Sequence, residues 1–274
     1  IGSVLRASGV DVATSLAGRS ELTRLRAAEA NIRDAGSVRQ LVEQCETLLS
    51  VLVPSCAIGI AEEVADALSG TNARPVFVEC NAIAPRTVGR VATLIRDAGG
   101  TIIDAGIIGA PPRHGSKTRF YYSGPDTSAF ESLGEHGLDI RWTGTEIGQA
   151  SGLKMIYAAS TKGPTAIWTQ LLVAAEAMGL KNILLAEYGL AEEPARHIKM
   201  TTEMPRRARR WIGEMEEIAA TFEHLGMTRR LFEGVADMYR FVGDTDLANQ
   251  TSREPDPDLD QMLRVLARAA RMGD

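Results

Sequence analysis

Cysteine, histidine and aromatic residues are all scarce in this chain of 274 residues, which has three cysteines, four histidines and 5% aromatic residues. Cys45, Cys56 and Cys80 are too widely spaced for a zinc motif or a disulfide framework. No two histidines lie three or four residues apart, the spacing that would place two ligands on one helix face. We therefore expect no metal site in the protein.

Long hydrophobic runs and an excess of basic residues are also missing. No uncharged apolar run reaches the ~18 residues that a membrane span requires, and no basic and apolar leader begins the sequence. The 35 Asp and Glu residues outnumber the 30 Lys and Arg residues, which argues against a general nucleic-acid binder. We expect no nucleic-acid or membrane partner, and a cytoplasmic location.

The first half of the chain alternates between short β-branched runs and helical patterns. This alternation predicts βαβ units with right-handed crossovers and a parallel sheet. The expected strands are Val10–Ser15, Leu48–Val53, Pro75–Cys80 and Thr101–Gly106. Two later runs, Arg119–Gly124 and Leu138–Gly144, are expected to extend the sheet at one edge.

The strand signals stop after Gly144, and helical spacing of apolar residues follows. Helices are expected over Ile147–Met178, Asn182–Gly189, Ala208–Leu225, Thr228–Val242 and Pro257–Met272. The predicted fold class is therefore an α/β, Rossmann-type doubly wound domain over residues 1–144, followed by an all-α domain over residues 145–274.

The opening residues differ from the usual start of a doubly wound domain. Ser3–Gly9 is expected to form the last turns of a helix that leads into the strand Val10–Ser15. Such a domain normally begins one strand earlier and has a glycine-rich loop before that helix. The first strand and the loop are missing from the pattern. Either the chain is truncated, or an unseen loop separates Gly2 from Ser3, and we favour the loop.

The residues after the strand Val10–Ser15 include Arg19 and Ser20. In dinucleotide folds an acidic residue here bonds the ribose of NAD, whereas an Arg accommodates the 2′-phosphate of NADP. A guanidinium and a hydroxyl suit a phosphate, so we favour NADP over NAD. The alternative is a surface turn in which Ser20 caps the next helix.

Two further strand ends are candidates for cofactor contacts, because ligands bind at the carboxyl edge of such a sheet. Val53 and Pro54 end one expected strand, and Asn81 follows the next. Asn81 could bond the nicotinamide carboxamide or ribose, and it is also a candidate substrate contact. The alternatives are an ordinary βα loop and a turn Asn before a helix that begins with Pro.

Gly106 lies at the end of the strand that begins at Thr101 and Gly109 lies just beyond it, and their lack of a side chain would let backbone approach a ligand closely. The alternative is a stiff loop rich in Gly and Pro.

The segment Gly148–Gly163 is the most informative, because it places Lys154 in the first turns of an apolar helix. Ala158 and Thr161 share its helix face. Partial burial among apolar neighbours would lower the pKa of Lys154 and suit it to proton transfer. The alternative is a Lys side chain that extends to water from a helix end.

Together these residues resemble the β-hydroxyacid dehydrogenase and 6-phosphogluconate dehydrogenase-like superfamily, in its NAD(P)-dependent oxidoreductase subgroup with a distinct helical C-terminal domain. The resemblance covers nearly the whole chain. Pro54 matches the family loop that contacts the nicotinamide, Asp104–Ala110 matches the substrate loop, and Gly148 to Lys154 loosely matches the catalytic G-x-x-x-K motif. The chain departs at Ile108, where Ser is common, and at Ala158, where Asn is usual.

The resemblance implies an NADP-dependent oxidoreductase that transfers a hydride between nicotinamide and a small carbonyl or hydroxy compound, in a cleft between two domains. Lys154 would be the general acid/base, and a homodimer would form through the helical domain. The implied substrate contacts are Asn81, Gly106, Ile108, Gly109, Tyr157, Ala158 and Thr161. Two alternatives stay open: reduction of a C=N bond, as in imine reductases, and a nucleotide-binding protein without turnover.

Overall fold

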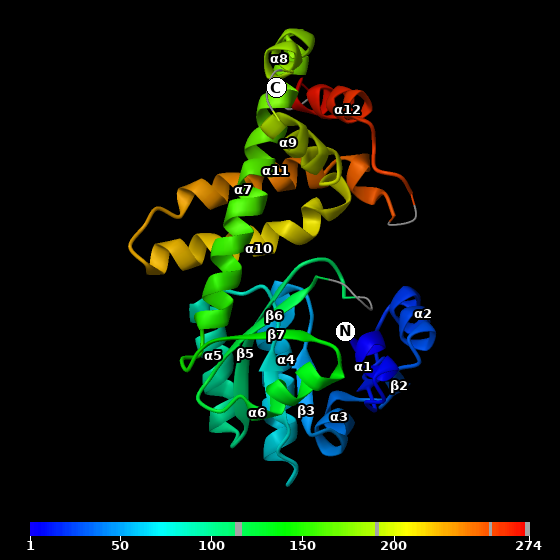
Figure 1. The fold of residues 1–274 in the computed structure, drawn as a ribbon, viewed down its shortest axis with the longest axis vertical. Coiled ribbons are helices and arrows are strands. Elements are labelled where there is room, and N and C mark those ends of the chain that lie inside the picture. The colour runs from blue at the N-terminus through cyan, green and yellow to red at the C-terminus, as the bar shows by residue number, and fades with distance from the viewer. Residues whose placement is uncertain (113–116, 190–191, 252–253, 272–274) are drawn as a thin grey trace. The chain divides into compact units, whose positions relative to one another are not determined.

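The computed structural model describes residues 1–112, 117–189, 192–251 and 254–271. The chain divides into two compact units, Ile1–Met155 and Ile156–Asp274. Helix α7 (Gln149–Ala177) runs through this boundary (Figure 1). The sequence suggests a domain break just before this helix, whereas the compact units divide within it, after its first turns.

The main sheet of the first unit has five strands in the order β3-β4-β5-β6-β7. Their bounds are β3 (Thr47–Ser50), β4 (Val76–Glu79), β5 (Thr101–Ile108), β6 (Arg119–Ser123) and β7 (Asp139–Gly144). The first three are parallel, β6 is antiparallel to β5, and β7 is parallel to β6. The predicted parallel sheet with two added edge strands is confirmed.

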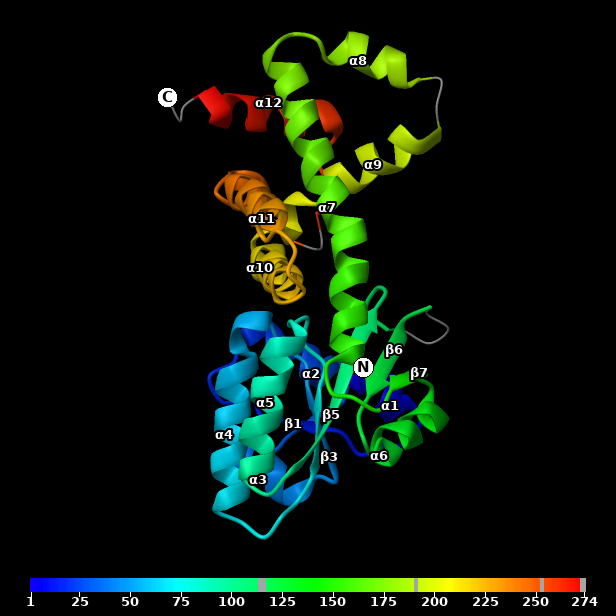
Figure 2. The same cartoon turned by 90° about the vertical axis from the view of Figure 1, so that its left-hand side faces the viewer.

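Helices cover both faces of this sheet (Figure 2). On one face lie α3 (Val38–Gln44), α4 (Ala57–Ser69) and α5 (Pro85–Asp97). The α5 residues Val88, Val91 and Ile95 recur at helical spacing and are fully buried in that core. On the other face, α1 (Gly2–Ala7) and α6 (Ser128–Glu131) pack over a second core cluster.

A separate small sheet is formed by β1 (Ala13–Thr14) and β2 (Arg33–Asp34), which are parallel and joined through α2 (Glu21–Glu29). The strand expected at Val10–Ser15 is therefore shorter than predicted. Strand β2 was not predicted, because both of its residues are polar and exposed and leave no apolar pattern. Helix α1 runs continuously from Gly2, so the expected unseen loop between Gly2 and Ser3 is wrong.

Two strand ends also differ from expectation. Strand β3 stops at Ser50 rather than Val53, since Pro54 begins a 3₁₀ turn that ends at Cys56. Strand β5 continues through Ile108, because its last residues pair with β6. The strand therefore runs two residues past its expected end at Gly106, and Ile108 lies in a strand and not in a loop.

Every described element of the second unit is helical, as predicted. After α7 come α8 (Lys181–Tyr188), α9 (Glu192–Thr202), α10 (Ala208–His224), α11 (Arg230–Gly243) and α12 (Leu259–Arg271). Helix α9 was not predicted. The helices α10 and α11 lie side by side (Figure 2). Trp211 of α10 lies edge-on to Tyr239 of α11. Among the described helices, none is long and apolar enough to cross a membrane.

Candidate active site

A row of four buried polar residues crosses the main sheet. The row consists of Ser50, Glu79, Asp104 and Ser123, which are successive register partners on β3, β4, β5 and β6. Register partners direct their side chains to the same face of a sheet. Buried polar groups are stable only where they are hydrogen-bonded, so such a row in the core indicates a built polar site.

Asp104 anchors the beginning of α7. Its carboxylate accepts hydrogen bonds from the Ser151 hydroxyl (2.5 Å), the Ser151 N–H (3.0 Å), the Gly148 N–H (2.9 Å) and the Ser123 hydroxyl (3.2 Å). The first N–H groups of a helix have no partner within it, and a carboxylate satisfies them while favouring the positive end of the helix dipole. Burial raises the pKa of Asp104, and these hydrogen bonds oppose that rise.

Gly106 allows α7 to pack directly on β5. A Cβ atom at Gly106 would lie 2.8 Å from the Ala150 carbonyl oxygen and 3.1 Å from the Lys154 Cβ. Any larger residue would therefore push the helix away from the strand. We expected the backbone at Gly106 to lie close to a ligand, and in the structure it lies close to α7 instead. This packing places the half-buried Lys154 beside β5.

Asn81 ties together the ends of β3 and β4. Its Nδ2 donates to Ser50 Oγ (2.8 Å), its Oδ1 accepts from the Leu52 N–H, and its own N–H donates to Glu79 Oε1 (2.7 Å). The side chain is almost fully buried. Asn81 therefore holds the segment that leads to Val53 and Pro54, which is a different task from the direct cofactor contact expected from the sequence.

Glu79 is the titratable group of this region. Burial raises its pKa to about 7, hydrogen bonds from Asn81 and Ser50 oppose the rise, and the nearby Asp104 adds to it. Its Oε2 atom is buried and has no hydrogen-bond partner among the described residues. A buried carboxyl that gains or loses a proton near neutral pH is typical of functional sites.

The predicted phosphate-binding residues lie after β1. Arg19 is exposed and follows Gly18, whose φ is +67°. The Ser20 hydroxyl accepts from the Thr23 N–H (3.3 Å) and so caps α2. The structure therefore gives Ser20 the capping role that the sequence analysis considered, while the Arg19 guanidinium faces solvent.

The segment after β3 presents apolar surface at the carboxyl edge of the sheet. Val53 is 46% exposed, and Pro54 is partly buried at the start of its 3₁₀ turn. An exposed aliphatic side chain at this edge is suited to packing against a flat ring.

The predicted substrate contacts are divided between the two units. Asn81, Gly106, Ile108 and Gly109 belong to the first unit, with the Ile108 side chain almost fully buried and Gly109 exposed. Tyr157, Ala158 and Thr161 belong to the second unit and continue α7 beyond Lys154. Tyr157 is 43% exposed and Ala158 is buried. The Thr161 hydroxyl donates to the carbonyl oxygens of residues 157 and 158 in its own helix.

A second lysine of α7, Lys162, has a partner in the second unit. It forms an ion pair with the buried Glu214, and its Nζ lies 5.4 Å from the centre of the Trp211 ring. The Tyr239 hydroxyl donates to the Lys162 carbonyl oxygen (2.5 Å). These contacts hold α7 against α10 and α11.

No role was predicted for Glu79, Ser123 or Ser151. The available signal was an acidic residue within each of two otherwise apolar runs, PVFVEC and TIIDAG. Ser123 and Ser151, whose hydroxyls bond Asp104, could not be recognised in the same way, because Ser is common in turns and helices. In the part of the chain that the structure describes, no group of three or more His, Cys, Asp or Glu residues could hold a metal ion.

A family model described as a domain of unknown function, DUF1932, matches residues 175–242. A relative from Methanothermus fervidus, an uncharacterized 28.5 kDa protein in a 7S RNA 5′ region, is 27% identical over 176 residues. That alignment spans 64% of this chain and 66% of the relative, just under two thirds of its length.

Solved structures resemble the chain over most of its length. A conserved protein of unknown function, described as structurally similar to 3-hydroxyacid dehydrogenases, is 29% identical, with a TM-score of 0.65 over 91% of this chain and 94% of that one. A 3-hydroxyisobutyrate dehydrogenase from Salmonella typhimurium is 12% identical, with a TM-score of 0.67 over 96% and 94%. An imine reductase from Myxococcus stipitatus in complex with NAD+ is 19% identical, with a TM-score of 0.54 over 98% and 94%.

These likenesses agree with the strand order and the helical second unit. The chain has the β-hydroxyacid dehydrogenase-like fold with a helical C-terminal domain, as the sequence resemblance implied.

Proposed function

We propose that the protein is an NADP-dependent oxidoreductase that transfers a hydride between the nicotinamide and a small carbonyl or hydroxy compound. The observation that carries this proposal is the placement of Lys154. The helix that bears it is capped by Asp104 and packs directly on β5 at Gly106. The fold shared with 3-hydroxyacid dehydrogenases supports the same class of reaction.

Residues at the carboxyl ends of β1 and β3 fit a dinucleotide. The exposed Arg19 guanidinium suits the 2′-phosphate of NADP, and Ser20 lies at the N-terminus of α2, where an anion is favoured. Val53 and Pro54 would pack against the nicotinamide, with Asn81 holding their segment in place. When bound, the cofactor supplies the hydride chemistry, and the protein supplies orientation and a proton.

Lys154 would act as the general acid/base. Its ammonium would donate a proton to the substrate oxygen as a carbonyl is reduced, and its amine would take that proton in the reverse direction. Gly109 and Tyr157 are exposed and would contact the substrate, with Thr161 further along α7. Ile108 and Ala158 are buried and would shape the site by their volume rather than by polar contacts.

The proposal is tested by titrating the protein with NADPH and with NADH, with binding followed by tryptophan fluorescence. A panel of 3-hydroxyacids, carbonyl compounds and cyclic imines is then screened at the nicotinamide absorbance. We expect tighter binding of NADPH and turnover of a carbonyl or hydroxy compound. Tight NADPH binding without oxidation or reduction of any panel member would instead identify a nucleotide-binding protein without turnover.

One observation favours reduction of a C=N bond as a second candidate. The buried Ala158 offers no polar group four residues after Lys154, and an imine reductase is among the structures of similar fold. A cyclic imine that is turned over while every carbonyl compound fails would support this candidate.

A further inference from the structure

A half-buried arginine, Arg119, begins β6 at the edge of the sheet where β5 ends. In the antiparallel pairing of these strands, Arg119 is the register partner of Ile108, and Tyr121 is the partner of Gly106. Register partners direct their side chains to the same face of a sheet, and so do alternate residues of one strand. Arg119 therefore shares the face on which α7 packs over Gly106.

Lys154 of α7 and Arg119 lie near enough for one small molecule to contact both. A Cβ atom at Gly106 would be 3.1 Å from the Lys154 Cβ. Residues that are diagonal to one another on neighbouring antiparallel strands lie about 7–8 Å apart, within reach of long side chains. Gly106 and Arg119 stand in this relation. A ligand beside the Lys154 amine is therefore within reach of the Arg119 guanidinium.

The Arg119 guanidinium has no acceptor of its own. Its Nε atom is buried and has no hydrogen-bond partner among the described residues. Its register partner on β7, Asp139, is already bound by Arg141, whose Nε and Nη2 donate to the two carboxylate oxygens (3.0 Å each). A buried N–H of a charged group is costly to leave unpaired. Arg119 is therefore suited to bind an acceptor from outside the chain.

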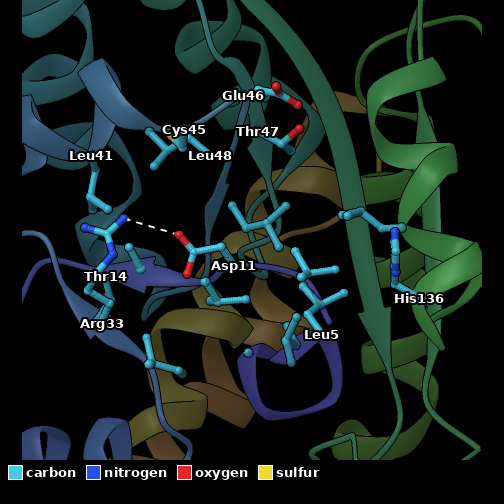
Figure 3. Close-up of a pocket in the computed structure, with 18 of the residues that line it drawn as sticks. Leu5, Asp11, Thr14, Arg33, Leu41, Cys45, Glu46, Thr47, Leu48 and His136 are labelled. Atoms are coloured by element: carbon cyan, nitrogen blue, oxygen red, sulfur yellow. Dashed lines mark ion pairs between the residues drawn. The ribbon is translucent and has the colours of Figure 1, made fainter. Parts of the chain in front are cut away.

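Other arginines of the first unit are paired at the surface. Arg33 of β2 forms an ion pair with Asp11 (3.5 Å), beside the cavity of about 740 Å³ that Figure 3 shows. Arg39 pairs with Glu43, one turn further along α3 (3.2 Å). Such exposed guanidinium groups remain hydrated, and their pairs contribute little to stability. Arg119 differs because burial removes water from its Nε and no described carboxylate replaces that water.

The surroundings of Arg119 favour an anion as the ligand. The neighbouring Ile108 is almost fully buried, and apolar surroundings strengthen the attraction between opposite charges. A guanidinium presents parallel N–H donors that match the two oxygens of a carboxylate. Asp139 does not cancel this charge, because its hydrogen bonds go to Arg141 and the attraction of Arg119 lowers its pKa only in addition to them.

We propose that Arg119 is a specificity-determining residue of the proposed reaction, which binds an oxyanion of the substrate while Lys154 serves the reacting oxygen. This inference rests on the proposed function and adds the charge of the substrate to it. The substrate is then a small compound that carries a carboxylate or a phosphate, two groups that share this chemistry. An uncharged ketone, alcohol or imine would leave Arg119 Nε unpaired.

The test measures binding of malonate and of inorganic phosphate to the full chain, with and without NADP+. Malonate has no alcohol, aldehyde or ketone group, so its binding is measured without turnover. Calorimetry gives the Kd, and ¹⁵N NMR follows the side-chain Nε–H of Arg119. We expect an anion to bind and to shift this resonance, while the uncharged malonamide does neither. Tighter binding of malonate indicates a carboxylate substrate, and tighter binding of phosphate indicates a phosphorylated one.

Variants of two arginines give the controls. Arg119→Gln should weaken binding of the preferred anion by about 10- to 100-fold. Arg119→Lys keeps the charge but loses the planar set of donors, so its affinity should be intermediate. Arg33→Gln, at the exposed pair with Asp11, should bind the anion as wild type does. The urea midpoint of Arg119→Gln should match that of wild type, whereas a merely structural arginine would lower it.

Three results would overturn the proposal. They are equal anion affinity of wild type and Arg119→Gln, binding of neither anion, and a loss of NADPH affinity in Arg119→Gln as large as that in Arg19→Ala, which would assign Arg119 to the cofactor. Failure of the proposed function gives a different result. A chain that binds an anion through Arg119 but turns over no compound of the panel would retain the anion site and refute the reaction.

Discussion

Ser151 donates two hydrogen bonds to Asp104, one from its hydroxyl (2.5 Å) and one from its backbone N–H (3.0 Å), each to a different carboxylate oxygen. The pair joins the first turn of α7 to the middle of β5. Lys154 lies one helical turn further on, so its position depends on these two hydrogen bonds between Ser151 and Asp104.

Replacing Asp104 with Asn should destabilise the protein and lower its turnover. One carboxylate oxygen becomes an NH₂ donor that faces N–H and O–H donors, so we expect the free energy of unfolding to fall by about 1–3 kcal/mol. Urea unfolding measures this loss. Because the hydrogen bonds between Asp104 and Ser151 orient the helix that carries Lys154, kcat should fall more than the affinity for NADPH.

Asp66→Asn is the matched control, because Asp66 is exposed on α4. It should change neither quantity. Equal stability of Asp104→Asn and Asp66→Asn would show that the hydrogen bonds from Asp104 do not hold α7 in place.

Replacing Glu79 with Gln should flatten the dependence of stability on pH. The pKa of Glu79 is raised from 4.5 to about 7, so between these values the folded protein binds more protons than the unfolded chain. Stability therefore falls as pH rises through that window, by roughly 3 kcal/mol when the carboxyl is fully ionised.

The measurement is urea unfolding of wild type and Glu79→Gln at pH 5 and pH 8. Wild type should lose more stability than the variant between these values. Parallel losses in both proteins would assign the pH dependence to other groups.

Lys154→Ala should abolish most carbonyl turnover. Loss of a general acid or base typically costs about 10²–10⁴ in rate. The mutation leaves Arg19, Val53 and Pro54 in place, so NADPH binding should persist. Steady-state kinetics and fluorescence titration separate the two effects.

Lys117→Ala, at an exposed Lys of the same unit, is the control and should keep full activity. If Lys154→Ala loses carbonyl reduction but keeps reduction of a cyclic imine, another group donates the proton in that reaction. Full carbonyl turnover by Lys154→Ala would refute its role as acid/base.

Arg19→Ala should weaken the binding of NADPH while leaving that of NADH unchanged. A hydrogen bond to a charged group contributes about 1.5–3 kcal/mol, which corresponds to roughly 10- to 100-fold in Kd. Arg26→Ala, at an exposed position on α2, is the matched control. An equal effect of Arg19→Ala on both nucleotides would remove the basis for NADP preference.

Ile167→Glu tests the proposed homodimer. Ile167 is 54% exposed on α7 in the helical unit, and burying a charge at an apolar interface is costly. Sedimentation should show a dimer for wild type and for Gln170→Glu, and a monomer for Ile167→Glu. A monomeric wild type would refute dimerisation through this helix.

Local pattern was sufficient to predict most elements of this protein. Apolar runs of four to eight residues identified the strands of the main sheet, and helical spacing located α7, α8, α10, α11 and α12. It failed at β2, where Arg33 and Asp34 are polar and exposed, and at Ile108, which was expected in a loop and lies in β5.

Local sequence pattern predicted less of the candidate site than of the fold. Lys154 could be singled out because a charge in an apolar helix is unusual, yet the groups that hold its helix could not. Asp104 and Ser151 are far apart in the sequence, and only strand register and the packing of α7 on Gly106 bring them together. Short-range periodicity records which face of an element is buried. Which distant polar groups meet on that face depends on pairing and packing energies summed over the whole fold.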